Sequence, residues 1–124
     1  MTEWLVLVIE DENDSLEFVQ GLLEHHGINS IGVSSGEQAL DAVREIHPNL
    51  IIIDLALPGL NGWEMLNHFK GMPALKQVPL VAITAYHTAE LAEQAIEAGF
   101  DAYFAKPLDA TSFVRELEGI IQLA

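Results

Sequence analysis

Acidic side chains stand where two strongly apolar segments of the chain end. Residues 4–9 run directly into Glu10 and Asp11, and residues 50–53 run directly into Asp54. A carboxylate beside a segment that must be buried is costly unless a partner or ligand makes use of it. Clustered carboxylates raise one another's pKa unless a cation joins them, and oxygen ligands without sulfur suit a hard ion. The pattern therefore predicts a magnesium site.

Two further polar groups follow the other apolar segments. Thr84 comes directly after residues 80–83, and Lys106 with Pro107 follows residues 101–105. Each residue alone is commoner as a local hydrogen-bond partner or a turn residue. The three carboxylates and the lysine together carry two net negative charges, which one divalent ion cancels. An anionic phosphoryl group would then meet a neutral site, so the combination predicts phosphoryl chemistry.

Five segments are expected to form the strands that position these residues. Residues 4–9, 50–53 and 80–83 are apolar without alternation, which is typical of strands covered on both faces of a parallel sheet. Residues 29–33 and 101–105 are weaker candidates and are expected nearer the edges. Because parallel strands end at the same edge of a sheet, the polar groups that follow them should lie close together.

Between the predicted strands the apolar spacing becomes helical. The stripes are Leu16, Val19, Leu22 and Leu23; Leu40, Val43 and Ile46; Met65, Leu66 and Phe69; Leu91, Ala95 and Ile96; and Phe113, Val114, Leu117, Ile120 and Ile121. Ser35 and Gln38 have the spacing of a capping box, Pro48 is expected to stop the second helix, and the third helix should start near Gly62. The chain therefore reads as βα repeated five times, an α/β fold with helices on both faces of the sheet.

Composition narrows the possible functions. The chain has 124 residues, suited to one domain over residues 1–124, and no cysteine. Its 19 acidic and 5 basic side chains give a net charge of −14, which disfavours direct binding to nucleic acid or anionic lipid. The apolar runs are too short to cross a membrane, and no export leader follows Met1. A cytoplasmic protein without membrane insertion is therefore expected.

The chain resembles, over residues 4 to about 122, the receiver domain of two-component response regulators. The resemblance rests on Glu10-Asp11, Asp54-x-x-x-Pro58-x-x-x-Gly62, Thr84-Ala85 and Tyr103-x-x-Lys106-Pro107. It implies a flavodoxin-like (βα)5 fold with five parallel strands in the order 2-1-3-4-5. Glu10 replaces the aspartate more usual at the first acidic position, and magnesium binding is expected to survive this change.

The resemblance also implies roles for the residues at the site. Asp54 would be the phosphoacceptor, taking a phosphoryl group from a phosphohistidine on a kinase or phosphotransfer protein. Asp11 and the Ala56 carbonyl would join Asp54 in holding Mg²⁺, and Glu10 would act mostly through a bound water. Lys106 would pair first with Asp54 and then with the phosphoryl oxygens.

The same resemblance implies a conformational response. Thr84 would hydrogen-bond the attached phosphoryl group, and Tyr103 would then rotate from an exposed to a buried position. Ala56 and Tyr86 flank the path of water in receivers, so this pair is expected to slow self-dephosphorylation. The Lys106–Pro107 bond is commonly cis in the family.

The sequence is compatible with three functions. The first is a phosphorelay signalling protein, not an enzyme with a separate substrate, whose partners are a histidine kinase or phosphotransfer protein and a downstream target. The second is an aspartate-nucleophile phosphatase, which would need a second aspartate where Ala56 stands. The third is a receiver-like module that is never phosphorylated. The chain could be a stand-alone regulator or part of a hybrid kinase or larger regulator, and a monomer or a phosphorylation-dependent dimer.

Two further residues are singled out by their place in the sequence. His87 is the one histidine expected to be close enough to influence the site, because it follows Tyr86 directly. Phe18 flanks the apolar stripe of the first helix, where core packing is expected and a place on the kinase-docking face is the alternative.

Overall fold

The computed structural model describes residues 3–123, and five parallel strands form a single sheet at its centre. In chain order the strands are β1 (Leu5–Ile9), β2 (Asn29–Val33), β3 (Leu50–Asp54), β4 (Leu80–Thr84) and β5 (Ala102–Ala105). Their spatial order is β2-β1-β3-β4-β5. This arrangement confirms the predicted flavodoxin-like fold and its strand order. Each predicted strand agrees with the observed one to within one residue at either end.

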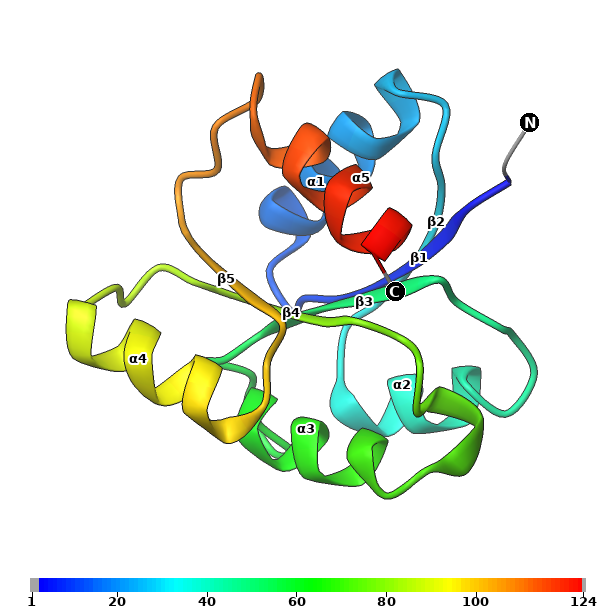
Figure 1. Cartoon of the computed structure of the whole chain (residues 1–124), viewed down its shortest axis with the longest axis vertical. Coiled ribbons are helices and arrows are strands. Elements are labelled where there is room, and N and C mark those ends of the chain that lie inside the picture. The colour runs from blue at the N-terminus through cyan, green and yellow to red at the C-terminus, as the bar shows by residue number, and fades with distance from the viewer. Residues whose placement is uncertain (1–2, 124) are drawn as a thin grey trace.

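Helices cover both faces of the sheet, as Figure 1 shows. They are α1 (Asn13–His25), α2 (Gly36–Ala42), α3 (Gly62–Lys70), α4 (Ala89–Ala98) and α5 (Phe113–Leu123), with a short 3-10 turn, η1 (Pro73–Leu75), before β4. Helices α1 and α5 lie on one face, whereas α2, α3 and α4 lie on the other. Within residues 3–123, no helix is long and apolar enough to cross a membrane.

The sheet separates two apolar clusters, one on each face. Alternate residues of β1 divide between them: Leu7 packs with α2, α3 and α4, and Val8 packs with α1 and α5. Residues of β3 and β4 are buried throughout, and those of β2 and β5 are mostly half-buried. The central and edge strands are therefore those predicted from the apolar runs.

Helix α2 is shorter than its apolar stripe predicted, because it ends at Ala42 and not near Pro48. A turn follows, in which Arg44 N donates to Asp41 O at 3.3 Å. Ile46 still packs against the core from beyond this turn. A stripe of apolar residues reports which side chains are buried, and a turn buries them as well as a helix does.

The capping box predicted before α2 is half formed. Ser35 Oγ accepts from Gln38 N at 3.1 Å, but the Gln38 side chain accepts from Ser34 N at 2.8 Å and not from the Ser35 backbone. A complete box occurs instead before α3, where Asn61 and Glu64 each accept from the other's backbone N–H. It fixes where the chain enters α3 after the loop that follows Asp54.

Gly62 lets α3 begin directly against the end of β3. A Cβ atom at this position would lie 2.7 Å from Leu55 Cα and 2.9 Å from Asp54 O, both backbone atoms. Such contacts are too close for any larger residue, since backbone atoms of a buried strand cannot move aside. The close approach holds the loop after β3 beside the carboxyl edge of the sheet.

Candidate functional site

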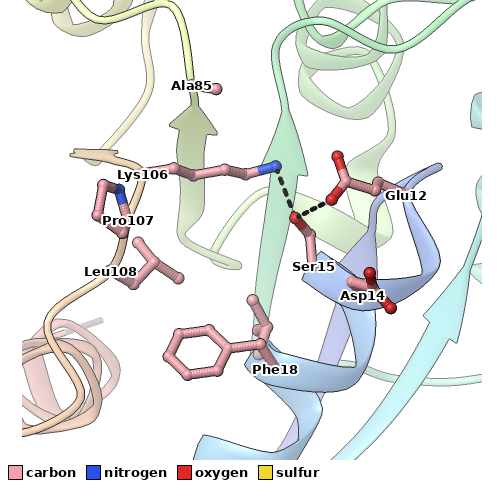
Figure 2. Close-up of a pocket in the computed structure, with 9 residues that line it drawn as sticks. Glu12, Asp14, Ser15, Phe18, Ala85, Lys106, Pro107 and Leu108 are labelled. Atoms are coloured by element: carbon pink, nitrogen blue, oxygen red, sulfur yellow. Dashed lines mark hydrogen bonds between the residues drawn. The ribbon is translucent and has the colours of Figure 1, made fainter.

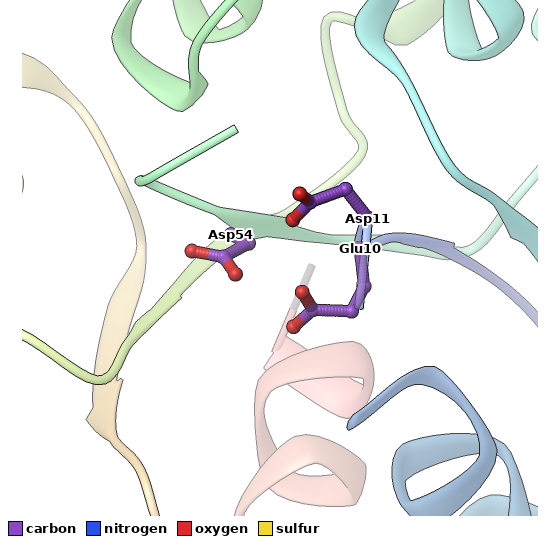
Figure 3. A group of neighbouring side chains, drawn as sticks. All are labelled: Glu10, Asp11 and Asp54. Atoms are coloured by element: carbon purple, nitrogen blue, oxygen red, sulfur yellow. The ribbon is translucent and has the colours of Figure 1, made fainter. Parts of the chain in front are cut away.

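Three carboxyl groups meet at the carboxyl edge of the sheet, as the chain pattern predicted. Asp54 is the last residue of β3, and Glu10 follows β1, which pairs with β3. Carboxylate oxygens of Glu10, Asp11 and Asp54 all lie within 4.8 Å of one another, and Figure 3 shows the three groups around a common space. Glu10 is 1% and Asp54 5% exposed, whereas Asp11 is exposed. The cluster is thus buried at its base and open at one side.

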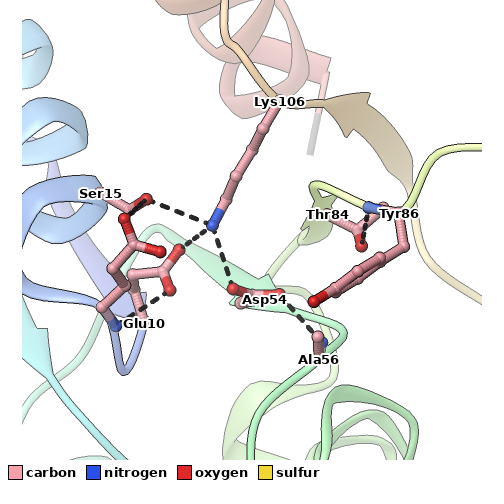
Figure 4. Close-up of polar contacts among 8 residues, drawn as sticks. Glu10, Ser15, Asp54, Ala56, Thr84, Tyr86 and Lys106 are labelled. Atoms are coloured by element: carbon pink, nitrogen blue, oxygen red, sulfur yellow. Dashed lines mark hydrogen bonds and ion pairs between the residues drawn. The ribbon is translucent and has the colours of Figure 1, made fainter.

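Lys106 brings a positive charge to this cluster from the end of β5. Its Nζ lies 2.5 Å from Glu10 Oε2 and 3.1 Å from Asp54 Oδ2 (Figure 4). A third contact joins Nζ to the hydroxyl of Ser15 at 3.4 Å. The pair with Asp54 was expected. The closer pair with Glu10 and the contact with Ser15 were not, because sequence spacing orders strands but does not give side-chain direction.

Burial and neighbouring charges raise the pKa of two of these groups, Glu10 and Lys106, for different reasons. Burial raises the pKa of Glu10 to about 7, and the adjacent Asp54 carboxyl adds to the rise while Lys106 opposes it. Burial alone would lower the pKa of Lys106, but its bonds to Glu10 and Asp54 outweigh that effect and raise it. Lys106 therefore stays charged, and the carboxyl groups carry more negative charge than one lysine balances.

Asp54 is oriented by its own loop as well as by Lys106. Its Oδ1 accepts from Ala56 N at 2.9 Å, which leaves Oδ2 for Lys106 (Figure 4). At the end of the neighbouring strand β4, the hydroxyl of the buried Thr84 accepts a hydrogen bond from Tyr86 N at 3.1 Å. The carboxylate thus faces an open space with both of its oxygens already fixed in direction.

A cavity of about 420 Å³ opens over the carboxylates. Its walls are formed by Glu10, Asp11, Glu12, Asp54, Ala56, Ala85, Tyr86 and Lys106. Oxygen donors crowded around an uncompensated negative charge fit a hard divalent cation, whereas no cysteine is present to favour a softer metal. The residues at this edge therefore suit Mg²⁺, and Ala56, whose carbonyl is an expected ligand, lines the same cavity.

The family model described as "Response regulator receiver domain" matches residues 6–118 of this chain. The chain belongs to that family. It is a receiver domain of the response-regulator type, a component of two-component signalling. The family resemblance inferred from the acidic pair, Asp54, Thr84 and Lys106 is thereby confirmed.

Similar proteins cover the receiver domain almost completely. The polar-differentiation response regulator DivK of Brucella ovis is 31% identical over 116 residues, which are 94% of each chain. A putative response regulator from Chloroflexus aurantiacus superposes with a TM-score of 0.92 at 26% identity, over 98% of this chain and 99% of the other. The receiver domain of a sensor histidine kinase from Pseudomonas aeruginosa PAO1, at 25% identity and TM-score 0.88, holds a magnesium ion in its active-site cleft. This match covers 98% of the present chain and 99% of the other.

A second cavity of the receiver domain, about 360 Å³, lies beside Lys106 between α1 and the loop after β5 (Figure 2). Phe18 lines it and is 46% exposed, so the expectation that this ring packs in the core is wrong. Pro107 and Leu108 form the opposite wall, and the Lys106–Pro107 bond is cis as predicted. An apolar hollow thus adjoins the charged site.

Tyr103 of the receiver domain lies half-buried on β5, next to the loop that follows Thr84. Its hydroxyl is 3.0 Å from Nδ1 of His87. The contact of His87 is with Tyr103, and His87 is not among the residues that line the cavity over the carboxylates. Its expected influence on the site therefore stays a prediction.

Proposed function

We propose that Asp54 accepts a phosphoryl group from a phosphohistidine on a partner kinase or phosphotransfer protein. The observation that carries the proposal is the convergence of Glu10, Asp11 and Lys106 on the Asp54 carboxylate beneath an open cavity. An isolated buried aspartate would be a structural cap or an unpaired charge. An aspartate oriented at both oxygens and open to a ligand is suited to act as a nucleophile.

The transfer itself balances with the groups that are present. One Asp54 carboxylate oxygen forms a bond to phosphorus while the bond from phosphorus to the histidine nitrogen breaks, and that nitrogen keeps the electron pair. The Lys106 ammonium group, which pairs with the Asp54 carboxylate before the transfer, would pair with the phosphoryl oxygens after it. The Thr84 hydroxyl would donate a hydrogen bond to one of those phosphoryl oxygens. Each donor lies on a neighbouring strand end, so little reorganisation is required.

Mg²⁺ would be held by Asp11, Asp54 and the Ala56 carbonyl, with Glu10 contributing through water. The ion supplies positive charge that offsets the carboxylates and the incoming phosphoryl oxygens. Support comes from the oxygen-only donor set and from the magnesium in the similar Pseudomonas receiver.

Phosphorylation would act by changing which protein the domain binds. Thr84, once bonded to the phosphoryl group, would draw in its loop, and Tyr103 would turn inward beside α4. The apolar cavity lined by Phe18 and Pro107 adjoins Lys106, whose ammonium group pairs with Asp54, so this cavity is the docking place we propose for the donor protein. On this reading the protein catalyses only its own phosphoryl transfer and dephosphorylation, whether residues 1–124 act alone or within a larger regulator.

Incubation with acetyl phosphate tests the proposal. In magnesium the protein should gain the mass of one phosphoryl group, stable in acid and lost in alkali, and should gain none in EDTA. Asp54→Asn keeps the shape of the side chain and should gain nothing. A receiver-like module would remain unmodified in every condition, and modification of Asp54→Asn would assign the chemistry to another residue.

A further inference from the structure

His87 and Tyr103 form a side-chain link between the loop after β4 and strand β5. The His87 Nδ1 atom lies 3.0 Å from the Tyr103 hydroxyl, and the two ring centroids are 5.5 Å apart at an interplanar angle of 44°. Burial raises the pKa of Tyr103, so its hydroxyl keeps the proton at neutral pH and can donate. The geometry is that of a hydrogen bond and not of stacked rings.

The loop that carries His87 is held at both ends. On one side Tyr86 N donates to the Thr84 hydroxyl at 3.1 Å, and on the other the Thr88 hydroxyl accepts from Leu91 N at 3.0 Å and caps α4. His87 therefore stands between the residue proposed to sense the phosphoryl group and the start of α4. A displacement of Thr84 can therefore reach α4 along this short segment of the chain.

Consecutive residues of the loop serve different neighbours. Tyr86 lines the cavity over Asp54, and Figure 4 shows its ring extending toward Ala56. His87 instead reaches β5, where Tyr103 pairs in register with Ala82 of β4. Tyr86 is therefore placed to affect the chemistry at Asp54, whereas His87 is placed to affect the orientation of Tyr103.

We propose that His87 is a positioning residue that holds Tyr103 in its half-buried orientation and opposes the switch until Asp54 is modified. This inference rests on the proposed function. The hydrogen bond between His87 and Tyr103 is found in a structure in which Lys106 pairs directly with Asp54, as it would while the Asp54 carboxylate carries no phosphoryl group. Because a hydrogen bond of this kind contributes modestly, its loss should shift the switching equilibrium by about twofold to tenfold.

Four variants isolate the contact. His87→Ala removes the ring, whereas His87→Asn keeps a polar atom bonded to Cγ, at the position of Nδ1. Tyr103→Phe removes only the hydroxyl, and the double variant His87→Ala with Tyr103→Phe completes a thermodynamic cycle. A merely structural role for His87 would not be restored by asparagine.

Fluorine NMR of protein labelled with 3-fluorotyrosine reports Tyr103 directly. The chain has two tyrosines, so Tyr86→Phe assigns the spectrum. Beryllofluoride with magnesium serves as the phosphoryl probe, and its midpoint is read from the Tyr103 resonance. Tyr103→Phe lacks that resonance, so its midpoint is read from intrinsic tryptophan fluorescence, to which Trp63 in the first turn of α3 contributes, calibrated on the parent protein. His87→Ala should start closer to the bound spectrum and reach its midpoint at about twofold to tenfold less beryllofluoride. His87→Asn should resemble the parent, and His87→Ala should have no further effect in Tyr103→Phe.

Different results overturn different statements. If beryllofluoride moves the Tyr103 resonance with the same midpoint in the parent and in His87→Ala, the inference about His87 fails while the proposed function stands. If His87→Asn behaves as His87→Ala, or if His87→Ala has its full effect in Tyr103→Phe, the hydrogen bond is not the cause. If the parent binds no beryllofluoride, the proposed function fails and the inference falls with it.

Discussion

The ammonium group of Lys106 forms a closer ion pair with Glu10 than with Asp54. The two contacts measure 2.5 Å and 3.1 Å from the same Nζ atom. Glu10 is the more deeply buried partner, so it depends more on this charge than Asp54 does. Glu10 thereby anchors the lysine beside Asp54, and Asp54 is the partner whose contact with Lys106 is more easily exchanged.

Removal of the lysine charge should destabilise the metal-free protein. In Lys106→Met the Glu10 and Asp54 carboxyls lose their shared counter-charge, so we expect the free energy of unfolding at neutral pH to fall by about 2–3 kcal/mol. Urea denaturation with EDTA measures the change, and magnesium should recover part of it. Lys76→Met, at an exposed position, should change stability by less than about 0.5 kcal/mol. Equal losses in the two variants would contradict the role given to Lys106.

Stability of the metal-free protein should depend on the ionisation of Glu10. Its pKa is raised from 4.5 to about 7, so the folded state binds more protons than the unfolded state between these values. The stabilising contribution of protonated Glu10 is therefore complete below pH 4.5 and is lost as the pH rises to about 7. The loss should amount to about 2–3 kcal/mol.

Glu10→Gln provides the comparison for this pH dependence. Glutamine has no proton to lose, so the variant should lack the decline in EDTA and should be more stable than the parent above pH 7. Unfolding in urea across this range measures both proteins. Parallel curves for the two proteins would show that another group causes the decline.

The strands and the acidic residues at their ends could be predicted from the sequence, because a buried strand is recognisable as a run of apolar residues. A strand covered on both faces, such as β3, must be continuously apolar, and its end then locates Asp54. Composition and topology together were enough to bring Glu10 and Lys106 to one edge. The family motif added the expected roles of these residues.

What the sequence did not predict depends on side-chain direction. The contacts of Lys106 with Ser15 and of His87 with Tyr103 each join segments far apart in the chain, and no spacing rule links them. The early end of α2 was missed for a related reason, since the apolar stripe reports burial and not the backbone hydrogen bonds. The position of Phe18 beside the apolar stripe of α1 favoured core packing, but its ring lines an open cavity.

Substitution of Gly62 should disrupt the approach of α3 to β3. In Gly62→Ala the new methyl group would meet the backbone of Leu55 and Asp54, so we expect a loss of about 2–4 kcal/mol in the free energy of unfolding. Gly21→Ala is the matched control, because nothing lies within 4 Å of a Cβ there and alanine favours the interior of α1. It should stabilise the protein by about 0.5–1 kcal/mol. Thermal unfolding distinguishes the two, and a Gly62→Ala protein as stable as the parent would show that the loop can yield.

Tyr86 should lengthen the lifetime of the phosphoryl group once Asp54 carries it. Its side chain is 74% exposed yet lines the cavity over the carboxylate, so its ring can obstruct water without contributing much to stability. Tyr86→Ala should therefore lose phosphate faster than the parent, by about threefold or more if the obstruction costs water roughly 0.7 kcal/mol. Tyr86→Phe keeps the ring and should retain the parent lifetime, which separates obstruction from any effect of the hydroxyl. The decay of phosphoprotein after removal of the donor measures all three proteins, and equal rates in Tyr86→Ala and the parent would show that water reaches Asp54 by another path.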